Sequence, residues 1–422
     1  MLKKSFKEQQ YRMLLVLSLA LISLRALAAE PLTLDQAVEL AATHAPQVQA
    51  GQYKQEAAAA GSDRAGRLPD PQLQFGIQNL TAQGSGAFNP NADSTTTRFV
   101  GISQDIPSSA ARAAERAKAR ANQGVAVADT QDARFRAKRN AATAWVDLWA
   151  AQRADVLLTQ LSSQNRTAID AARARLAGGT GTATDVLAAR AASIDLDNQL
   201  EAIRGEAQAA RAAVTRWVGV DVAREPLASA PDFSRLPVPE SRLLGMPDLQ
   251  APLLVWGPRV SAAEAAVQSA QASKQPDWSV GASYGVRAPG LPAMASVQIG
   301  MRLPLFARHR EDQDIDARSA DLQAVRAERE DARLAQVETV ERSLARWQSL
   351  NAQVIRDEHT LLPLAHDRAH TALATYSGGG SLEPWLDARR AEITANLTYA
   401  NALAARARAW IELAYLIPEN TP

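Results

Sequence analysis

The sequence predicts a mainly α-helical protein with a small β part, in which one structural unit occurs twice. The 422-residue chain is 46% hydrophobic but only 5% aromatic and is rich in Ala, Arg, Glu and Gln, a composition that favours long helices. Two pairs of short segments alternate between apolar and polar residues, which is typical of strands. The same order of features recurs about 200 residues further along the chain, as expected for an internal repeat.

The composition also excludes several classes of protein. The 46 Lys and Arg residues are balanced by 45 Asp and Glu residues, so the chain lacks the basic footprint of a nucleic-acid-binding protein. It contains no cysteine, which excludes disulfides, thiolate metal sites, a cysteine nucleophile and an acylated N-terminal cysteine. We find no phosphate-binding loop and no redox ligand set, and we expect no cofactor, no bound metal and no catalytic residue.

The N-terminus has the features of an export signal. Basic residues precede the apolar run Met13–Leu24, and small residues follow in Ala26-Leu27-Ala28. As a helix this run would rise only about 18 Å, which is short of the roughly 30 Å hydrocarbon core of a membrane. We therefore predict a cleaved signal peptide at residues 1–28 and an exported mature protein without a membrane-spanning helix.

Two repeats are predicted on either side of a proline-rich connector. Pro69-Asp70-Pro71 in the first half corresponds to Pro276-Asp277 in the second, and Gly178-Gly179 corresponds to Gly378-Gly379. Seven prolines between 226 and 258 exclude a long helix there and indicate an extended segment. The predicted organisation is repeat 1 at 29–222, connector at 223–258 and repeat 2 at 259–418.

Each repeat is expected to contain a helix, two strands and a long helical hairpin. Stretches free of proline, such as Ser108–Leu176, allow single helices of up to about 100 Å that end at glycine clusters. Pro363 is the one expected interruption in the second long helix. The predicted elements are a helix at 34–65, strands at 72–80 and 98–106 and a hairpin at 108–218, then a helix at 260–274, strands at 278–286 and 297–303 and a hairpin at 307–416.

The strands have one apolar and one polar face. Val297, Ile299 and Met301 alternate with Gln298 and Gly300, and the segments at 72–80 and 278–286 alternate in the same way. The segment at 98–106 is less regular but also keeps apolar residues on one face. This alternation also fits a sheet packed on a soluble core, but the Ala-rich helices offer no apolar layer to cover it. Lipid outside and water inside a barrel fits better, and four strands are too few to close one. We therefore expect an oligomer, with eight strands in a dimer or twelve in a trimer.

The order of elements resembles the TolC family of outer-membrane channel proteins over essentially the whole mature chain. Leu32–Ala37, with Thr33 placed as a cap, looks like the family's N-terminal helix start, and 181–187 and 381–388 look like its two periplasmic tip turns. The resemblance implies a homotrimer in the outer membrane. Its four strands per chain would share a twelve-stranded β-barrel that continues into a periplasmic α-helical coiled-coil tunnel.

The resemblance also implies a function and partners. The chain would be a passive conduit of a tripartite efflux system, docked to a periplasmic adaptor and an inner-membrane pump of the RND type. Asp70-Pro71 followed by Gln78-Asn79-Leu80 looks most like the channels of heavy-metal efflux systems. Two alternatives stay open within the family, namely drug efflux and type I protein secretion. An alternative of another class is a periplasmic adaptor protein, which would have one helical hairpin instead of two repeats.

Three acidic residues are candidates for a pore constriction at the tips. The resemblance puts Asp387 at a pore-lining position, where three copies around an axis would concentrate negative potential. The family's other acidic position is Pro384 here, so Glu383 or Asp185 would have to replace it. Arg389 or Arg390 could donate to Asp387, and Asp367, a turn and a half before the tip, is expected to matter little. Asp387 could equally be a solvated carboxylate at a helix start.

Two further motifs point to other chemistry. Ser283 is the centre of a G-x-S-x-G pattern, but a hydrolase nucleophile requires a sharp strand-to-helix turn, and here the pattern lies inside a predicted strand. His359, His366 and His370 fall roughly on one helical face and would suit zinc or copper. Pro363 disturbs their register, and the sequence leaves open whether they bind metal.

Overall fold

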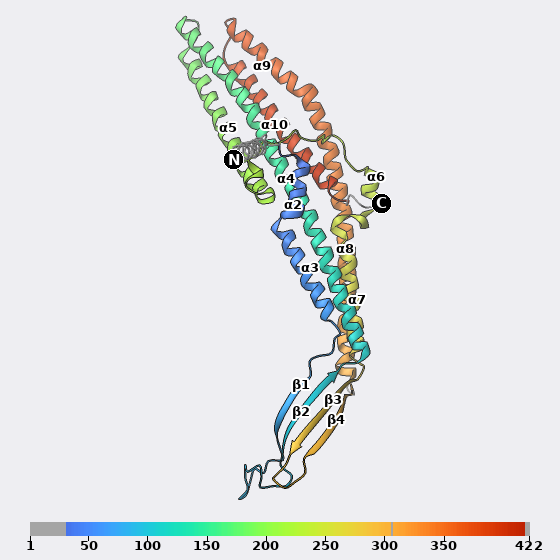
Figure 1. Ribbon diagram of the computed structural model, residues 1–422. Coiled ribbons are helices and arrows are strands. Elements are labelled where there is room, and N and C mark those ends of the chain that lie inside the picture. Colours follow the sequence, from blue (N-terminus) through green and yellow to red (C-terminus); the bar gives the residue numbers. More distant parts are fainter. Residues whose placement is uncertain (1–30, 305–306, 418–422) are drawn as a thin grey trace, which may run out of the picture. The chain divides into compact units, whose positions relative to one another are not determined.

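The computed structural model describes residues 31–304 and 307–417 (Figure 1). The predicted signal peptide at 1–28 lies outside these residues. The chain forms two compact units, one made of 31–45, 134–240 and 342–415, the other of 46–133, 241–304, 307–341 and 416–417. None of the described helices is both long enough and apolar enough to cross a membrane.

Two helices stand where one was predicted at 34–65. They are α2 (Leu34–His44) and α3 (Pro46–Arg64). Thr33 caps α2 as predicted: its Oγ1 accepts from the Gln36 N–H at 3.1 Å, while the Gln36 side chain accepts from the Thr33 N–H at 3.0 Å. The chain breaks at Ala45, whose ψ of 132° is extended, because the residue before a proline is driven out of the helical region.

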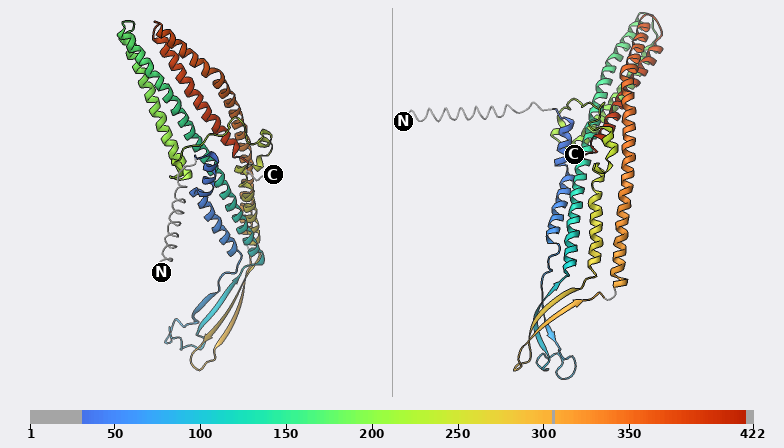
Figure 2. Two further views of the ribbon diagram at one scale, coloured as in Figure 1. Left: turned by 45° about the horizontal axis from the view of Figure 1, so that its top comes forward. Right: turned by 90° about the vertical axis from the view of Figure 1, so that its right-hand side faces the viewer.

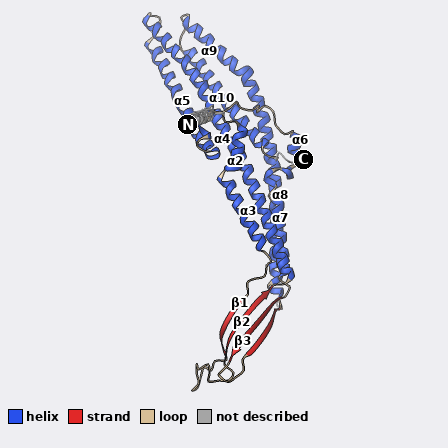
Figure 3. Ribbon diagram, in the orientation of Figure 1, coloured by secondary structure: helices blue, strands red, loops and turns tan. Residues whose placement is uncertain are grey.

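Four strands form one antiparallel sheet in the second unit (Figure 3). They are β1 (Gln72–Gln78), β2 (Thr97–Ile106), β3 (Asp277–Val286) and β4 (Met294–Arg302), in the order β1-β2-β3-β4. Their bounds lie within three residues of the prediction. β1 ends earlier than expected, and Asn79 just after it has a positive φ of 57°. Pairing of β2 with β3 joins the two predicted hairpins into a single sheet.

The strand register aligns like residues on each face of the sheet. Leu73, Ile102, Ala282 and Val297 form one row across the four strands, and Phe75, Val100 and Tyr284 lie in the neighbouring row. Residues of the opposite face alternate with these rows. One such row consists of Gln74, Gly101, Ser283 and Ser296. The alternation predicted strand by strand is therefore continuous over the whole sheet.

The two long helical hairpins agree closely with their predicted bounds. The first is α4 (Ser109–Ala177) with α5 (Ala183–Val218), and the second is α8 (Glu311–Arg356) and α9 (Leu362–Ser377) with α10 (Glu383–Ala414). The expected interruption at Pro363 is a π-helical turn, η5 (Asp357–Leu361), which ends two residues before the proline. A proline inside a helix lacks the N–H for the preceding turn and clashes with its carbonyl, and a wider turn relieves both problems.

The connector is less extended than predicted. It contains the short helices η1 (Val222–Arg224), α6 (Glu240–Gly245), η2 (Pro247–Leu249) and η3 (Ala251–Leu253), and α7 (Trp256–Ala272) begins before residue 258. Prolines at the first positions of η2 and η3 explain this, because a proline is tolerated in a first helical turn. In the second unit α7 runs beside α4 and α8, with Arg259 3.2 Å from Asp129 and Arg326 2.9 Å from Glu264 (Figure 2).

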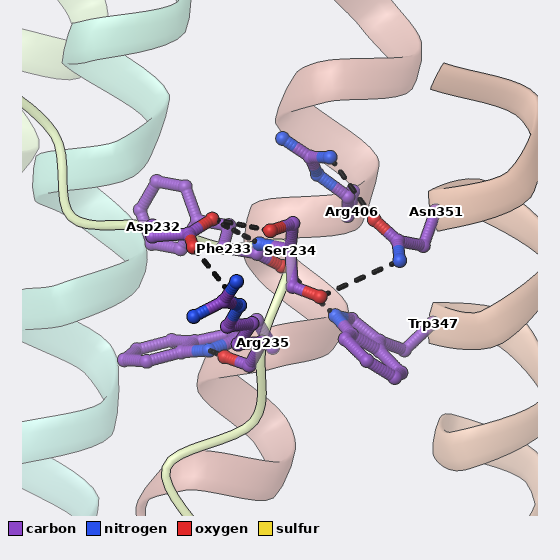
Figure 4. A network of polar contacts seen from close by, with 8 residues as sticks. Asp232, Phe233, Ser234, Arg235, Trp347, Asn351 and Arg406 are labelled. Atoms are coloured by element: carbon purple, nitrogen blue, oxygen red, sulfur yellow. Dashed lines mark hydrogen bonds and ion pairs between the residues drawn. The ribbon is translucent and has the colours of Figure 1, made fainter. Parts of the chain in front are cut away.

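An aromatic anchor fixes the connector to the helices of the first unit (Figure 4). The Phe233 side chain is buried edge-on against Trp149 and Trp410, with ring centroids 5.8 and 5.3 Å away. The backbone carbonyls of Phe233 and of Arg235 also accept hydrogen bonds from tryptophan side chains. Trp347 Nε1 donates to the Phe233 carbonyl at 3.0 Å, and Trp410 Nε1 donates to the Arg235 carbonyl at 2.7 Å.

Candidate functional site: the sheet and the helical tips

The sheet exposes its apolar face. Phe75 is 82% exposed and Val297 is 76% exposed, although side chains of these types are usually buried. A contiguous apolar surface on a folded chain indicates that something covers it. The other exposed apolar side chains of this face are Leu73, Ile77, Val100, Ile102, Trp278, Val280, Tyr284, Val286, Ile299 and Met301.

The opposite face consists mainly of small and polar residues, with Phe99 and Met294 as its large apolar exceptions. A Cβ at Gly101 would lie 2.8 Å from the Ser283 Cβ, and one at Gly285 would collide with the Thr97 side chain. Glycine is therefore required where neighbouring strands converge on this face, which lets the sheet curl toward it. In the described part of the chain β1 and β4 each have one strand neighbour, so the outer edge of each carries unpaired backbone groups.

Glycines and caps build the two tip turns. In the first turn Gly179 has a φ of +73°, and the Thr182 Oγ1 accepts from the Asp185 N–H at 3.1 Å. The Asp185 carboxylate in return accepts from the Thr182 N–H at 3.1 Å. The second turn has Gly379 with a φ of +110°. One apolar cluster from both hairpins packs behind the turns: Ala168, Ala172, Val186, Ala189, Tyr376, Leu382 and Trp385.

Arg175 links the two tip turns. Its Nη1 donates to the carbonyls of Tyr376 and Gly380, the latter at 2.9 Å, and its Nη2 donates to the Thr180 carbonyl at 3.1 Å. The guanidinium also lies over the Tyr376 ring, 4.3 Å from the centroid. Tyr376 is fully buried, and this desolvation raises the pKa of its hydroxyl. One arginine of the first hairpin thus holds the last turn of α9 and the loop after it.

The acidic gate candidates differ in their surroundings. Asp387 and Glu383 line an open groove of about 730 Å³ between α9 and α10. The Asp387 side chain is 59% exposed and lies 3.5 Å from Arg390. Asp185 does not line this groove, and its carboxylate serves the capping box of α5. Asp367 lines the groove as well, so it does not serve as a neutral comparison for Asp387.

Arg389 is not a donor to Asp387. It points into the helix packing, where its Nη1 donates to Glu392 at 2.6 Å and its Nη2 donates to the Leu161 carbonyl of α4 at 2.7 Å. The side chains of Arg389 and Glu392 are only 7% and 4% exposed. The second Glu392 oxygen lies 2.9 Å from His366 Nδ1. A buried ion pair thus connects α10 with α4 and α9.

The three histidines do not share one ligand set. His359 lies in the π-helical turn, His366 bonds to Glu392, and the rings of His366 and His370 are 6.4 Å apart. Within residues 31–304 and 307–417 no three His, Asp or Glu side chains converge as metal ligands would. Ser283 lies inside β3 opposite Gly101 and Ser296, so the strand-to-helix turn of a nucleophile elbow does not form around it.

The sequence profile of the outer membrane efflux protein family matches residues 37–220 and 243–417. The chain belongs to the outer membrane efflux protein family. The two matched segments leave out residues 221–242, which belong mostly to the connector predicted at 223–258. No curated protein sequence matches this family member significantly.

Solved structures of outer-membrane channels share the fold of this family member. It is 18% identical to CusC, whose structures describe transmembrane channel formation, over 90% of both chains with a TM-score of 0.74. The Campylobacter jejuni CmeC channel is 12% identical over 90% of this chain and 84% of its own, with a TM-score of 0.76. The open Neisseria gonorrhoeae MtrE channel is 16% identical over 90% and 88%, with a TM-score of 0.70. These identities establish the fold alone.

Sequence reasoning missed the polar links of the tip region. One signal could have identified Arg175. When Gly178 is aligned with Gly378, the second half has Thr375 where the first half has Arg175, so the two halves differ at this position. The burial of Arg389 and Glu392 gave no signal, because charged pairs three residues apart on a helix are usually solvated. Only the packing of α10 against α4 distinguishes this pair from the exposed pair Asp387 and Arg390.

Proposed function

We propose that this efflux protein is the outer-membrane channel of a tripartite efflux system and acts as a passive homotrimeric conduit. Three sheets would join edge to edge into a twelve-stranded barrel in the outer membrane, and the helical hairpins would form the periplasmic tunnel. A periplasmic adaptor would dock at the tips, and an inner-membrane pump of the RND type would supply the energy.

The exposed apolar face of the sheet carries this proposal. Lipid is the environment that suits a face of Leu, Ile, Val, Phe and Tyr side chains, while the small polar residues of the other face suit a water-filled lumen. Backbone groups at an open edge cannot be left unpaired in lipid, so β1 of one chain must pair with β4 of the next. Twelve strands also fall within the size range of bacterial barrels.

Heavy-metal cations are the proposed substrates. The support is the sequence Asp70-Pro71 followed by Gln78-Asn79-Leu80, which resembles the channels of heavy-metal efflux systems. Deleting the gene should sensitise cells to copper, zinc, cobalt or cadmium ions by several-fold in minimal inhibitory concentration, with little change for antibiotics and dyes. The reverse pattern would contradict the substrate and favour drug efflux.

Asp387 is proposed to line the narrowest part of the tunnel, assisted by Glu383. Three exposed carboxylates around the axis would attract cations and bind multivalent ones. In planar bilayers Asp387→Asn should reduce cation selectivity and weaken block by multivalent cations, and adding Glu383→Gln should enlarge the effect. Asp185→Asn should change selectivity less, because that carboxylate is engaged in a cap.

A matched control separates charge at the gate from charge elsewhere near the tips. Asp170 is also exposed on a helix and pairs with Arg173 three residues later, at 3.3 Å, as Asp387 pairs with Arg390. Asp170→Asn should leave selectivity unchanged. Normal selectivity in a fully assembled Asp387→Asn trimer would show that this carboxylate is not at the constriction.

A further inference from the structure

A cavity of about 410 Å³ lies in the second unit where the strands meet the helices. Pro107 follows β2, Asp277 begins β3, Arg302 ends β4 and Arg112 lies in the first turn of α4, and all four line it. The cavity is rich in charge, with four arginines and three carboxylates on its wall. They are Arg67, Arg112, Arg302, Arg310, Glu115, Asp277 and Glu311.

Two of the four arginines are neutralised within the chain. Arg302 lies 3.6 Å from Asp277, and Arg310 Nε donates to Glu311 at 3.0 Å. The hydrogen bond from Arg310 lowers the pKa of Glu311, so this carboxylate stays ionised and holds its partner. Arg67 and Arg112 form no ion pair in the described part of the chain, and Glu115, the remaining carboxylate, is exposed.

Arg112 has an unsatisfied donor. Its Nε is buried and has no hydrogen-bond partner among the described residues. A buried charged donor without an acceptor is costly, and native proteins rarely leave one so. An anion in the cavity would supply this acceptor.

Gly66 allows Arg67, the other arginine without an ion pair among the described residues, to lie on the cavity wall. It has a φ of +65°, and a Cβ there would lie 2.8 Å from the Arg116 side chain and closer still to the Arg112 carbonyl oxygen. Arg116 Nη1 donates to the Gly66 carbonyl at 3.3 Å. Only glycine allows this close approach to α4, which places Arg67 on the same cavity wall as Arg112.

We propose that Arg67 and Arg112 bind a phosphate group in this cavity, supplied by a phospholipid headgroup. The inference rests on the proposed function, because the helix-proximal ends of the strands reach a membrane surface only if the sheet spans the outer membrane. Guanidinium groups match phosphate oxygens in charge and in fork geometry. Basic pockets at the edge of a membrane-embedded segment recognise acidic headgroups in this way.

Native mass spectrometry of the delipidated full-length protein in detergent tests the site. Phosphatidylglycerol should bind the unmodified protein, whereas diacylglycerol with the same chains but no phosphate should not. The double variant Arg67→Gln/Arg112→Gln should bind phosphatidylglycerol at least tenfold more weakly. Arg67→Gln alone, a change at an exposed side chain that does not threaten folding, should show an intermediate loss.

The control is Arg120→Gln, an exposed arginine on α4 about 12 Å further along the helix and outside the cavity. It should bind lipid like the unmodified protein. Equal lipid binding by the double variant and the unmodified protein would overturn the inference, as would diacylglycerol binding as well as phosphatidylglycerol. If inorganic phosphate bound as tightly as the lipid, the lipid source would be wrong. Trimer content and conductance of the same samples test the proposed function separately.

Discussion

At the scale of single residues, Arg175 is the side chain that joins the two tip turns. It makes charged hydrogen bonds to three carbonyls, and such bonds stabilise by about 1.5–3 kcal/mol each when both partners are shielded from water. Arg175→Met should therefore increase amide exchange in 176–182 and 376–382 by one or two orders of magnitude, because every 1.4 kcal/mol is tenfold.

Hydrogen exchange followed by mass spectrometry measures this effect peptide by peptide. Arg173→Met is the matched control, since Arg173 lies two residues away on the same helix and only pairs with the exposed Asp170. In the Arg173→Met variant the peptides 176–182 and 376–382 should exchange as in the unmodified protein. Identical exchange in the two variants would mean that the apolar cluster holds the turns without Arg175.

Asp232 next to the aromatic anchor gives a pH-dependent prediction. Its carboxylate accepts from the Ser234 hydroxyl at 2.5 Å and from the Ser234 N–H at 2.9 Å, and these bonds lower its pKa (Figure 4). A carboxyl whose pKa is lowered by folding stabilises the folded state above its unfolded pKa of about 3.9, and this stabilisation disappears as the pH falls through the folded value.

Ser234→Ala removes the hydrogen bond from the Ser234 hydroxyl, which is the larger of the two causes of the lowered Asp232 pKa. The variant should be less stable than the unmodified protein at pH 6, and the difference should shrink steadily below pH 4. Thermal unfolding of the detergent-solubilised protein at pH 6, 4 and 3 measures this. A difference that is the same at all three values would assign the effect to lost packing and not to the Asp232 charge.

At the scale of elements, the sequence is most informative where one local rule applies. The strands follow from alternation, the length of α4 from the lack of proline, and the start of α2 from Thr33. The break at Ala45 is a consequence of Pro46, but the helical composition on both sides of it predicts one continuous helix. Pairing of β2 with β3 is not predictable from local pattern, because the two strands are about 170 residues apart and periodicity does not identify a partner.

Gly285 tests whether crowding on the inner face shapes the sheet. A methyl group there would collide with the Cγ2 of Thr97 on β2, so Gly285→Ala should destabilise the assembled protein by about 1–3 kcal/mol. The temperature at which the oligomer dissociates in detergent reports this loss.

Two further variants test whether the loss of stability comes from the contact between residues 285 and 97. Thr97→Ser deletes the colliding methyl group, so the double variant Gly285→Ala/Thr97→Ser should recover most of the stability. Ser283→Ala changes the same face of β3 two residues earlier and should have little effect. No recovery in the double variant would show that the loss does not come from this contact.

At the scale of the whole molecule, the helical composition and the count of four strands are enough to predict a shared barrel, because four strands cannot close one alone. The roles of the acidic residues at the tips are harder to predict, because the sequence does not show how the surroundings of Asp387, Glu383 and Asp185 differ. The structure separates them into two groove residues and one capping residue. Their roles in the proposed trimer depend on residues of the neighbouring chains.

The central claim, that β1 of one chain pairs with β4 of the next, can be measured by disulfide trapping. The natural chain has no cysteine, so engineered pairs face no background. Single cysteines at Gln72, Gln74 or Gly76 on β1, each combined with Gln298→Cys on β4, sample three registers of the same face. Neighbouring strands lie about 4.8 Å apart, within reach of a disulfide.

Gln72→Cys with Ser103→Cys is the internal control, because these residues are directly opposite on β1 and β2 and should crosslink within one chain. For at least one edge register, oxidation in outer-membrane vesicles should give a crosslinked trimer and no larger species, since a closed ring has no free edge. A protein that forms the control disulfide but stays monomeric in every edge register would contradict the shared barrel.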